Sequence, residues 1–209
     1  MEITKFGHSC VLLDNGSTKI LFDPGIYSNI PSIAVDAILI THIHQDHCDI
    51  EKIKNLLNIN KDLRIITNSE VQSLLLEQGI NSEIVEAGAM TKINNISISG
   101  QGTTHAIMHP TLPVFQNTGY SVNEQVFHPG DALTIPVNPV EVLLLPIAAP
   151  WSKLEETLDY ISAVKPAIVF PIHDGFLKDG GAFYRLSKQW CDTLGIKFIE
   201  PELEKIYGI

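Results

Sequence analysis

The seven residues 41–47, which read Thr-His-Ile-His-Gln-Asp-His, hold the densest set of chemically reactive side chains in the sequence. They follow the apolar run 37–40, which predicts a short buried strand. Three imidazoles and one carboxylate at the end of such a strand can converge on a metal ion, because imidazole nitrogen and carboxylate oxygen both suit zinc. As an ordinary polar turn, the same cluster would be costly to desolvate. We therefore predict a metal site at residues 41–47.

The spacing of these side chains indicates two ions rather than one. His42 and His44 are two residues apart, so they project to the same side of an extended segment. Asp46 and His47 fall where the chain must turn into its next element. A single tetrahedral ion cannot readily accept all four side chains, whereas two ions about 3.5–4 Å apart can share them. This arrangement is typical of two-metal hydrolytic sites.

Two more candidate ligands follow strands later in the chain. Asp131 comes after a predicted hairpin, and the glycine before it lets the backbone approach closely. A carboxylate at a strand end can bridge two cations with its two oxygens, although an aspartate there can also cap a turn or a helix. His173 follows the apolar strand 167–172 in the same way that His42 follows residues 37–40. We predict that both are metal ligands.

Five short motifs together span nearly the whole chain: Gly-His-Ser at 7–9, Phe-Asp-Pro at 22–24, His-Ile-His-Gln-Asp-His at 42–47, His-Pro-Gly-Asp at 128–131 and Pro-Ile-His at 171–173. With these motifs the chain resembles the metallo-β-lactamase-fold superfamily, most of all the small single-domain branch that contains the ascorbate-phosphate lactonase-like proteins. The resemblance implies an α/β fold, a four-layer αββα sandwich in which two mixed β-sheets pack face to face and helices cover both outer faces. It implies no substrate, since one fold hosts many chemistries.

The resemblance also implies the remaining site residues. His105 lies in the loop that supplies the third imidazole of the first metal in this superfamily, and His109 is the alternative in the same loop. Asp23 matches a carboxylate that lies beneath the ligands and accepts an imidazole N–H; otherwise it caps a turn. His8 faces either the cleft or solvent. The expected assignment places His42, His44 and His105 on one zinc ion, Asp46, His47 and His173 on the other, and Asp131 with a solvent oxygen between the two.

This arrangement predicts a metal-dependent hydrolase. Zinc lowers the pKa of bound water from about 15.7 to about 7, so a bridging hydroxide can attack a carbonyl carbon or a phosphorus atom at neutral pH. We expect Asp46, Asp131 and His8 to act in catalysis, with two Zn²⁺ ions as cofactors, Mn²⁺ as the alternative and Fe less favoured. The general acid stays open among His8, His109 and His128. The expected substrate is a small-molecule ester, lactone or phosphodiester. Lactone opening is the reaction that depends least on a general acid, because a metal ion can hold the leaving alkoxide.

Two other functions stay open. The same ligands could hold a single iron for redox chemistry on a thiol or persulfide. Alternatively, the chain could be a non-catalytic, metal-binding regulatory protein. Metal content separates the first alternative from a hydrolase, because the hydrolase is expected to hold about two zinc or manganese ions.

Composition favours a single domain over residues 1–209, since 209 residues with 44% apolar content can form a substantial core. The resemblance implies that this domain is metallo-β-lactamase-like. The formal charge of −10 disfavours nucleic acid as a partner, and a small-molecule substrate is expected instead. We expect no membrane span and no signal peptide, hence a cytoplasmic protein, with a homo-oligomer left open. Cys10, Cys48 and Cys191 form no CxxC pair, so reduced thiols are expected; Cys48 is read as a helix-start residue rather than a ligand.

Hydrophobic periodicity predicts the elements that position these residues. Leu154, Leu158 and Ile161 are expected on the buried face of one helix, and Trp151 either walls the substrate site or packs in the core. Leu112, Val114 and Phe115 lie in a proline-containing loop that either forms a rim for substrate or packs down on itself. Strands are expected at 3–6, 10–13, 19–22, 37–41, 64–67, 84–85, 90–93, 96–99, 118–122, 125–128, 140–145, 167–172 and 197–199, and helices at 49–57, 69–78, 153–164 and 183–194.

Overall fold

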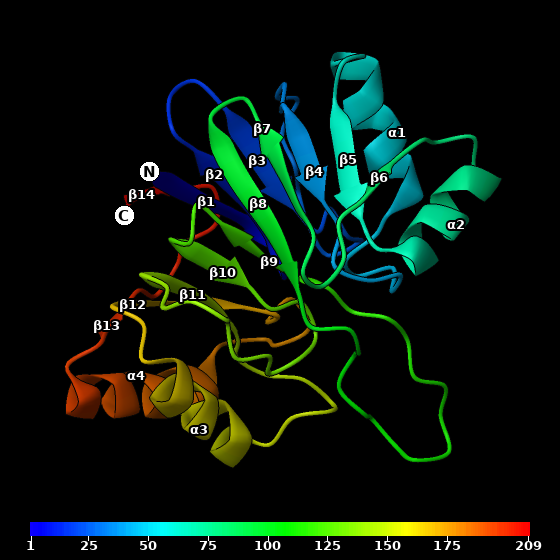
Figure 1. Cartoon of the computed structure of the whole chain (residues 1–209). Coiled ribbons are helices and arrows are strands. Elements are labelled where there is room, and N and C mark those ends of the chain that lie inside the picture. The colour runs from blue at the N-terminus through cyan, green and yellow to red at the C-terminus, as the bar shows by residue number, and fades with distance from the viewer.

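The computed structural model describes residues 1–209 and contains two seven-stranded mixed β-sheets that lie face to face (Figure 1). The first sheet has the order β14 (Ile206–Gly208), β1 (Glu2–Gly7), β2 (Cys10–Asp14), β3 (Lys19–Phe22), β4 (Ala37–Leu39), β5 (Arg64–Thr67) and β6 (Glu83–Ile84). The second has the order β13 (Lys197–Phe198), β12 (Ile168–Ile172), β11 (Val142–Pro146), β10 (Val126–His128), β9 (Gly119–Val122), β8 (Ile96–Gln101) and β7 (Met90–Ile93).

Two helices cover the outer face of each sheet. The helices α1 (Ile50–Ile59) and α2 (Ser69–Glu77) lie on the first sheet, and α3 (Leu154–Val164) and α4 (Gly181–Leu194) lie on the second (Figure 1). The four-layer α/β sandwich expected from the sequence is therefore confirmed. Every helix falls short of the length and apolarity that a membrane crossing requires.

Successive side chains of a strand point to opposite faces of the sheet, and this alternation explains how the sheets and helices pack in layers. In β2, Val11 and Leu13 point into the core between the sheets, whereas Leu12 packs toward the outer helices. Strands covered on both faces, such as β4, β11 and β12, are apolar on both sides, whereas β8 alternates buried isoleucines with partly exposed serines. The central core joins the two sheets through residues such as Val142 and Phe170, which are fully buried. Burial on this scale fixes the strand ends that carry the polar residues described below.

Local signals set the helix boundaries. Asp49 precedes α1 and accepts hydrogen bonds from the backbone N–H groups of Glu51 and Lys52, which would otherwise lack partners. Asn68 caps α2 in the same way through the N–H of Val71. Gly195, at φ 70°, ends α4 in the left-handed conformation that glycine adopts without steric cost.

The structure corrects two expectations about the elements. In α3, Ile161 is buried and Leu158 packs against the same core, as expected, whereas Leu154 lies outside that core and Thr157 and Tyr160 are buried as well. Tyr160 can face inward because its hydroxyl donates to the carbonyl of Thr134 at 2.6 Å. The strand β14 has no counterpart among the elements expected from the sequence. It forms by pairing with β1 at the other end of the chain, and no local sequence pattern predicts such a long-range pairing.

A buried ion pair connects β1 to the end of β12. The side chain of Lys5 is 1% exposed, and its Nζ lies 2.7 Å from Asp174 Oδ2 and 3.0 Å from the carbonyl of Pro171. Burial lowers the pKa of Lys5, while Asp174 acts in the opposite direction. These contacts hold the segment that carries His173.

Removing this lysine is expected to destabilise the fold. Lys5→Met leaves the Asp174 carboxylate without its cation, so the free energy of unfolding should fall by about 3 kcal/mol in urea titrations. Lys188→Met is the matched control, because Lys188 pairs with Asp192 on the exposed face of α4. That control should cost less than about 1 kcal/mol. Equal losses in the two variants would show that the buried pair is not structurally important.

Candidate metal centre

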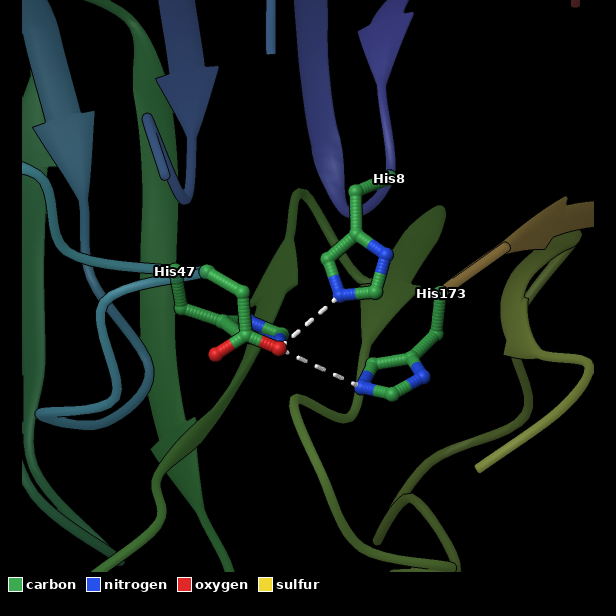
Figure 2. Close-up of side chains that lie close together, drawn as sticks. His8, His47 and His173 are labelled. Atoms are coloured by element: carbon green, nitrogen blue, oxygen red, sulfur yellow. Dashed lines mark hydrogen bonds and ion pairs between the residues drawn. The ribbon is translucent and has the colours of Figure 1, made fainter. Parts of the chain in front are cut away.

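Ligand-type side chains gather where strands of both sheets end. The segment 42–47 follows β4, His105 follows β8, Asp131 follows β10 and His173 follows β12. Figure 2 shows the rings of His8, His47 and His173 converging from three separate segments. The structure brings the predicted site residues into two groups whose ligand atoms lie within 4.8 Å of one another: cluster A, with His42, His44, His105 and Asp131, and cluster B, with His8, Asp46, His47 and His173.

Asp131 lies between the two clusters. Its Oδ2 is 3.4 Å from Nε2 of His105 in cluster A and 2.9 Å from Nε2 of His173 in cluster B. Its Oδ1 is 3.1 Å from Nε2 of His47. No other carboxylate approaches ligands of both clusters so closely, and this position suits a bridging role.

Five buried polar atoms in the clusters lack a hydrogen-bond partner. An unsatisfied buried nitrogen or oxygen is costly, so five together at one point indicate a missing ligand. In each of the four histidines concerned, Nδ1 faces an acceptor, which leaves the lone pair of Nε2 free to bind a cation. The five atoms are Nε2 of His42, His47, His105 and His173 and Oδ1 of Asp131.

The acceptors beneath the rings form a connected network. Asp23 Oδ2 accepts from Nδ1 of His47 at 2.7 Å, the hydrogen bond that the family resemblance implies. The same carboxylate accepts from the N–H of Thr41 at 2.9 Å and from its hydroxyl at 2.8 Å. The Thr41 hydroxyl in turn lies 3.0 Å from Nδ1 of His42. Asp23 therefore orients one imidazole of each cluster.

The remaining rings pack against one another around the clusters. His44 is half-buried, and its ring meets those of His42, His105 and Phe115 edge to face, at centroid distances of 4.8, 4.8 and 4.9 Å. Phe115 thus holds the loop that carries His105 against the segment 42–47. A ring in this position is held in place and presents its nitrogen to cluster A.

Ionisation of the carboxylates suits a cation pair. Burial raises the pKa of Asp46, but the hydrogen bond from His8 and the nearby His47 lower it to about 2. Burial acts in the same direction on Asp131, yet His47 and His173 hold its pKa well below the usual value. Burial lowers the pKa of His47, but Asp131 and Asp23 raise it well above its usual value. Without a cation, the two ionised carboxylates are therefore balanced by a proton on His47, and a bound divalent cation would displace that proton from Nε2.

His8 lies in cluster B but differs from the other imidazoles. Its Nδ1 accepts the backbone N–H of Gly175 at 3.0 Å, so in the neutral ring the proton is on Nε2. That Nε2 lies 3.2 Å from Asp46 Oδ2 and donates to it. Burial lowers the pKa of His8 to about 4, which keeps the ring neutral. The geometry suits a donor that holds Asp46 better than a fourth ligand of cluster B.

Unusual backbone conformations occur at the same place. His8, Asp23 and His173 have φ values of 49°, 41° and 60°, in the left-handed region that residues other than glycine rarely adopt. Conformations of this kind persist only where the surrounding contacts impose them. At Gly25 a side chain would lie 1.7 Å from the carbonyl oxygen of Asp46, so only glycine allows this close approach.

Three candidates from the sequence lie outside the clusters. His109 is exposed in its loop, where its Nδ1 pairs with the Thr111 hydroxyl at 2.8 Å. Cys48 is buried, and burial together with Asp23 raises the pKa of its thiol to about 12, so it stays protonated. His128 is buried, and its Nδ1 accepts the N–H of Gly130. His105 rather than His109 therefore joins the cluster, and His128 is placed as a structural residue.

The buried His128 predicts a pH dependence of stability. Burial lowers the pKa of this histidine, so the unfolded chain takes up a proton near pH 6.5 while the folded protein does not. Stability is therefore lost as the pH falls below about 6.5. In zinc-free protein, the loss of unfolding free energy from about pH 7 to pH 5.5 should be about 1 kcal/mol smaller in His128→Gln than in the wild type. Urea titrations at the two pH values check this, and equal losses would contradict it.

Sequence reasoning missed two partners of the ligands. Trp151 donates from Nε1 to Asp131 Oδ2 at 3.0 Å, which orients the carboxylate. The sequence left this tryptophan open between a substrate wall and the core. From the sequence alone, Thr41 is only the first residue of the predicted metal-binding segment 41–47. The Trp151–Asp131 contact spans 20 residues, and Thr41 connects its neighbour His42 to Asp23, 18 residues earlier. The only available signal in the sequence is the place of both residues near predicted ligands.

Comparisons with known proteins show which proteins this chain is similar to. The family described as "Beta-lactamase superfamily domain" matches residues 2–173. Protein Rv0786c of Mycobacterium tuberculosis is 38% identical over 184 residues, which cover 85% of this chain and 85% of that protein. A metal-dependent hydrolase of Methanocaldococcus jannaschii is 27% identical, with 96% of this chain and 97% of the relative covered.

The fold also resembles solved structures. Igni18, a metallo hydrolase from Ignicoccus hospitalis, superimposes with a TM-score of 0.75 at 21% identity, over 100% of this chain and 98% of that one. At this identity the likeness concerns the arrangement of the sheets and helices alone.

Proposed function

This chain belongs to the β-lactamase superfamily and is a small metal-dependent hydrolase of the metallo-β-lactamase fold, and on this premise we propose that two divalent cations, zinc or manganese, occupy clusters A and B. The proposed reaction is hydrolysis of a small-molecule ester, lactone or phosphodiester. The observation that carries the proposal is the set of five buried ligand atoms without hydrogen-bond partners. Imidazole and carboxylate ligands of this kind suit both metals.

Each cluster would hold one cation. His42, His44 and His105 would bind the first, and Asp46, His47 and His173 the second, with Asp131 between the two. Such cations, when bound, supply an activated water molecule as the nucleophile and polarise the acceptor oxygen of the substrate.

The surrounding residues would keep these groups in position. Trp151 donates to Oδ2 of Asp131 and so fixes the orientation of a carboxylate whose two oxygens both face cluster ligands. His8 donates to Asp46, and we assign it a positioning role in place of a general acid. Asp46 and Asp131 both stay ionised at neutral pH, since their pKa values are lowered. The chain thereby keeps its ligands in the charge state that cations require.

A hydrolysis screen tests the proposal. Protein loaded with Zn²⁺ or Mn²⁺ is assayed against lactones, phosphodiesters and β-lactams beside a His44→Ala variant, and bound metal is measured by mass spectrometry. About two ions per chain and turnover of at least one substrate class are expected. His44→Ala should lower turnover by at least about 100-fold, because cluster A loses a ligand. One iron per chain, or metal-loaded protein without any hydrolysis, would contradict the proposal.

A further inference from the structure

The cleft above the clusters has an unusual lining. It encloses about 560 Å³, and all its polar side chains other than the tyrosine hydroxyl belong to the clusters: His44, Asp46, His105, Asp131 and His173. The rest of the lining is apolar or aromatic: Tyr27, Met108, Ala148, Ala149, Pro150, Trp151, Phe176, Leu177 and Phe183. Lysine, arginine, serine, threonine, asparagine and glutamine are absent from it. Beyond the metal centre, the cleft therefore offers a substrate mainly apolar contact.

Aromatic side chains stand directly beside the ligands. The ring of Phe176 lies 5.5 Å from that of His173, and the ring of Trp151 lies 6.0 Å from the same histidine. Tyr27 and Phe176 remain 50% and 47% exposed, so their faces are free to contact a bound molecule. Covering large apolar side chains of this kind favours the binding of an apolar molecule.

Apart from the Tyr27 hydroxyl, the polar groups that line the cleft outside the clusters are engaged, and so are two nearby lysines. The exposed Lys178 follows the lining residue Leu177 in the chain but does not itself line the cleft. The indole N–H of Trp151 donates to Asp131. Lys5 is buried against Asp174, and Nζ of Lys52 donates to backbone carbonyls of the segment 25–28. A phosphate or carboxylate on the part of the substrate outside the reacting group would therefore lose water and gain no cationic partner. The net charge of −10 opposes anionic substrates over a longer range.

We propose that the substrate is a neutral carboxylic ester or lactone with an apolar or aromatic body, and that esters with an anionic group on that body are poor substrates. The inference rests on the proposed function and specifies its substrate class. In the reaction, water adds to the carbonyl carbon and the acyl carbon–oxygen bond breaks. The alkoxide takes up a proton, which gives a carboxylic acid and an alcohol with no change in oxidation state.

A matched pair of esters tests the substrate class. In zinc-loaded protein, kcat/KM for 4-nitrophenyl 4-methylphenylacetate is compared with that for 4-nitrophenyl 4-carboxyphenylacetate, which has the same leaving group and nearly the same size. The neutral ester should be preferred by at least about 100-fold. Similar values would overturn the substrate class while leaving the hydrolase intact. Absence of turnover with every ester, lactone and phosphodiester would overturn both.

A cation placed in the lining should change this preference. Met108→Lys introduces an ammonium group at the partly exposed Met108, and Met108→Leu is the control of similar volume. The lysine variant should raise kcat/KM for the carboxylate ester by about 10-fold relative to the leucine variant. An unchanged preference would show that the missing cation does not set the specificity.

A binding measurement separates the cleft from the chemistry. The chain has two tryptophans, so Trp190→Phe leaves Trp151 as the only indole fluorophore. Without metal, neutral 4-nitroanisole should quench its emission saturably, and Phe176→Ser in the same background should weaken binding by about 10-fold. Saturable quenching would show that the cleft binds an apolar molecule, independently of the turnover assays. Absence of quenching, or no effect of Phe176→Ser, would overturn the inference.

Discussion

Asp131→Asn is expected to lose at least one of its two metal ions and to lower hydrolysis by at least about 1000-fold. Asp131 is the carboxylate between the clusters, with Oδ1 3.1 Å from His47 and Oδ2 3.4 Å from His105. An amide has no net charge and turns either its oxygen or its NH₂ group toward each side, so it cannot attract both cations. Mass spectrometry of the purified protein and initial rates with the best substrate of the screen measure the two effects.

Asp62→Asn is the matched control for this variant, since Asp62 is exposed and lies outside both clusters. It should keep the wild-type metal content and activity. If Asp131→Asn also kept two ions and full activity, Asp131 would not be the residue that bridges the two ions.

Asp23→Asn should lower the affinity of both clusters for metal, by about 10- to 100-fold each. Asp23 contacts no substrate, and its effect passes through the rings of His47 and His42, the second by way of the Thr41 hydroxyl. The amide of an asparagine places an NH₂ group or a single acceptor where the carboxylate accepts several hydrogen bonds. The loss of metal affinity is measured by incubating the zinc-loaded protein with increasing amounts of a chelator and determining the zinc that remains bound.

Asp36→Asn controls for a loss of stability alone. Asp36 accepts the backbone N–H of Lys19 at 2.7 Å, away from the clusters. Its substitution should weaken the fold without changing metal affinity. Equal affinity losses in the Asp23 and Asp36 variants would mean that Asp23 stabilises the protein generally and does not orient the ligands.

Much of the centre could be predicted because its information is local. The ligands of residues 42–47 stand together in the sequence, and Asp131 and His173 each follow a strand whose apolar pattern predicts its end. His105 depended on family resemblance, because its loop has no periodic pattern and contains a second histidine, His109. The structure brings His105 and not His109 to cluster A. The loop joins β8 to β9 of the second sheet, and its position depends on contacts such as that of Phe115 with His44 rather than on its own sequence pattern.

What the sequence could not predict depends on contacts between distant segments. The buried Lys5 pairs with Asp174, Trp151 donates to Asp131, and β14 pairs with β1. A lysine in a short strand ordinarily indicates an exposed face, and its burial requires a partner that only the folded chain supplies. The tautomer of His8 likewise depends on the N–H of Gly175, far along the chain.

X-ray diffraction at the zinc absorption edge, from crystals grown with zinc, tests the two-ion centre most directly. The account predicts two anomalous peaks about 3.5–4 Å apart. One would lie among His42, His44 and His105, the other among Asp46, His47 and His173, with Asp131 between them. A single peak, or no peak with these side chains turned away from one another, would contradict it.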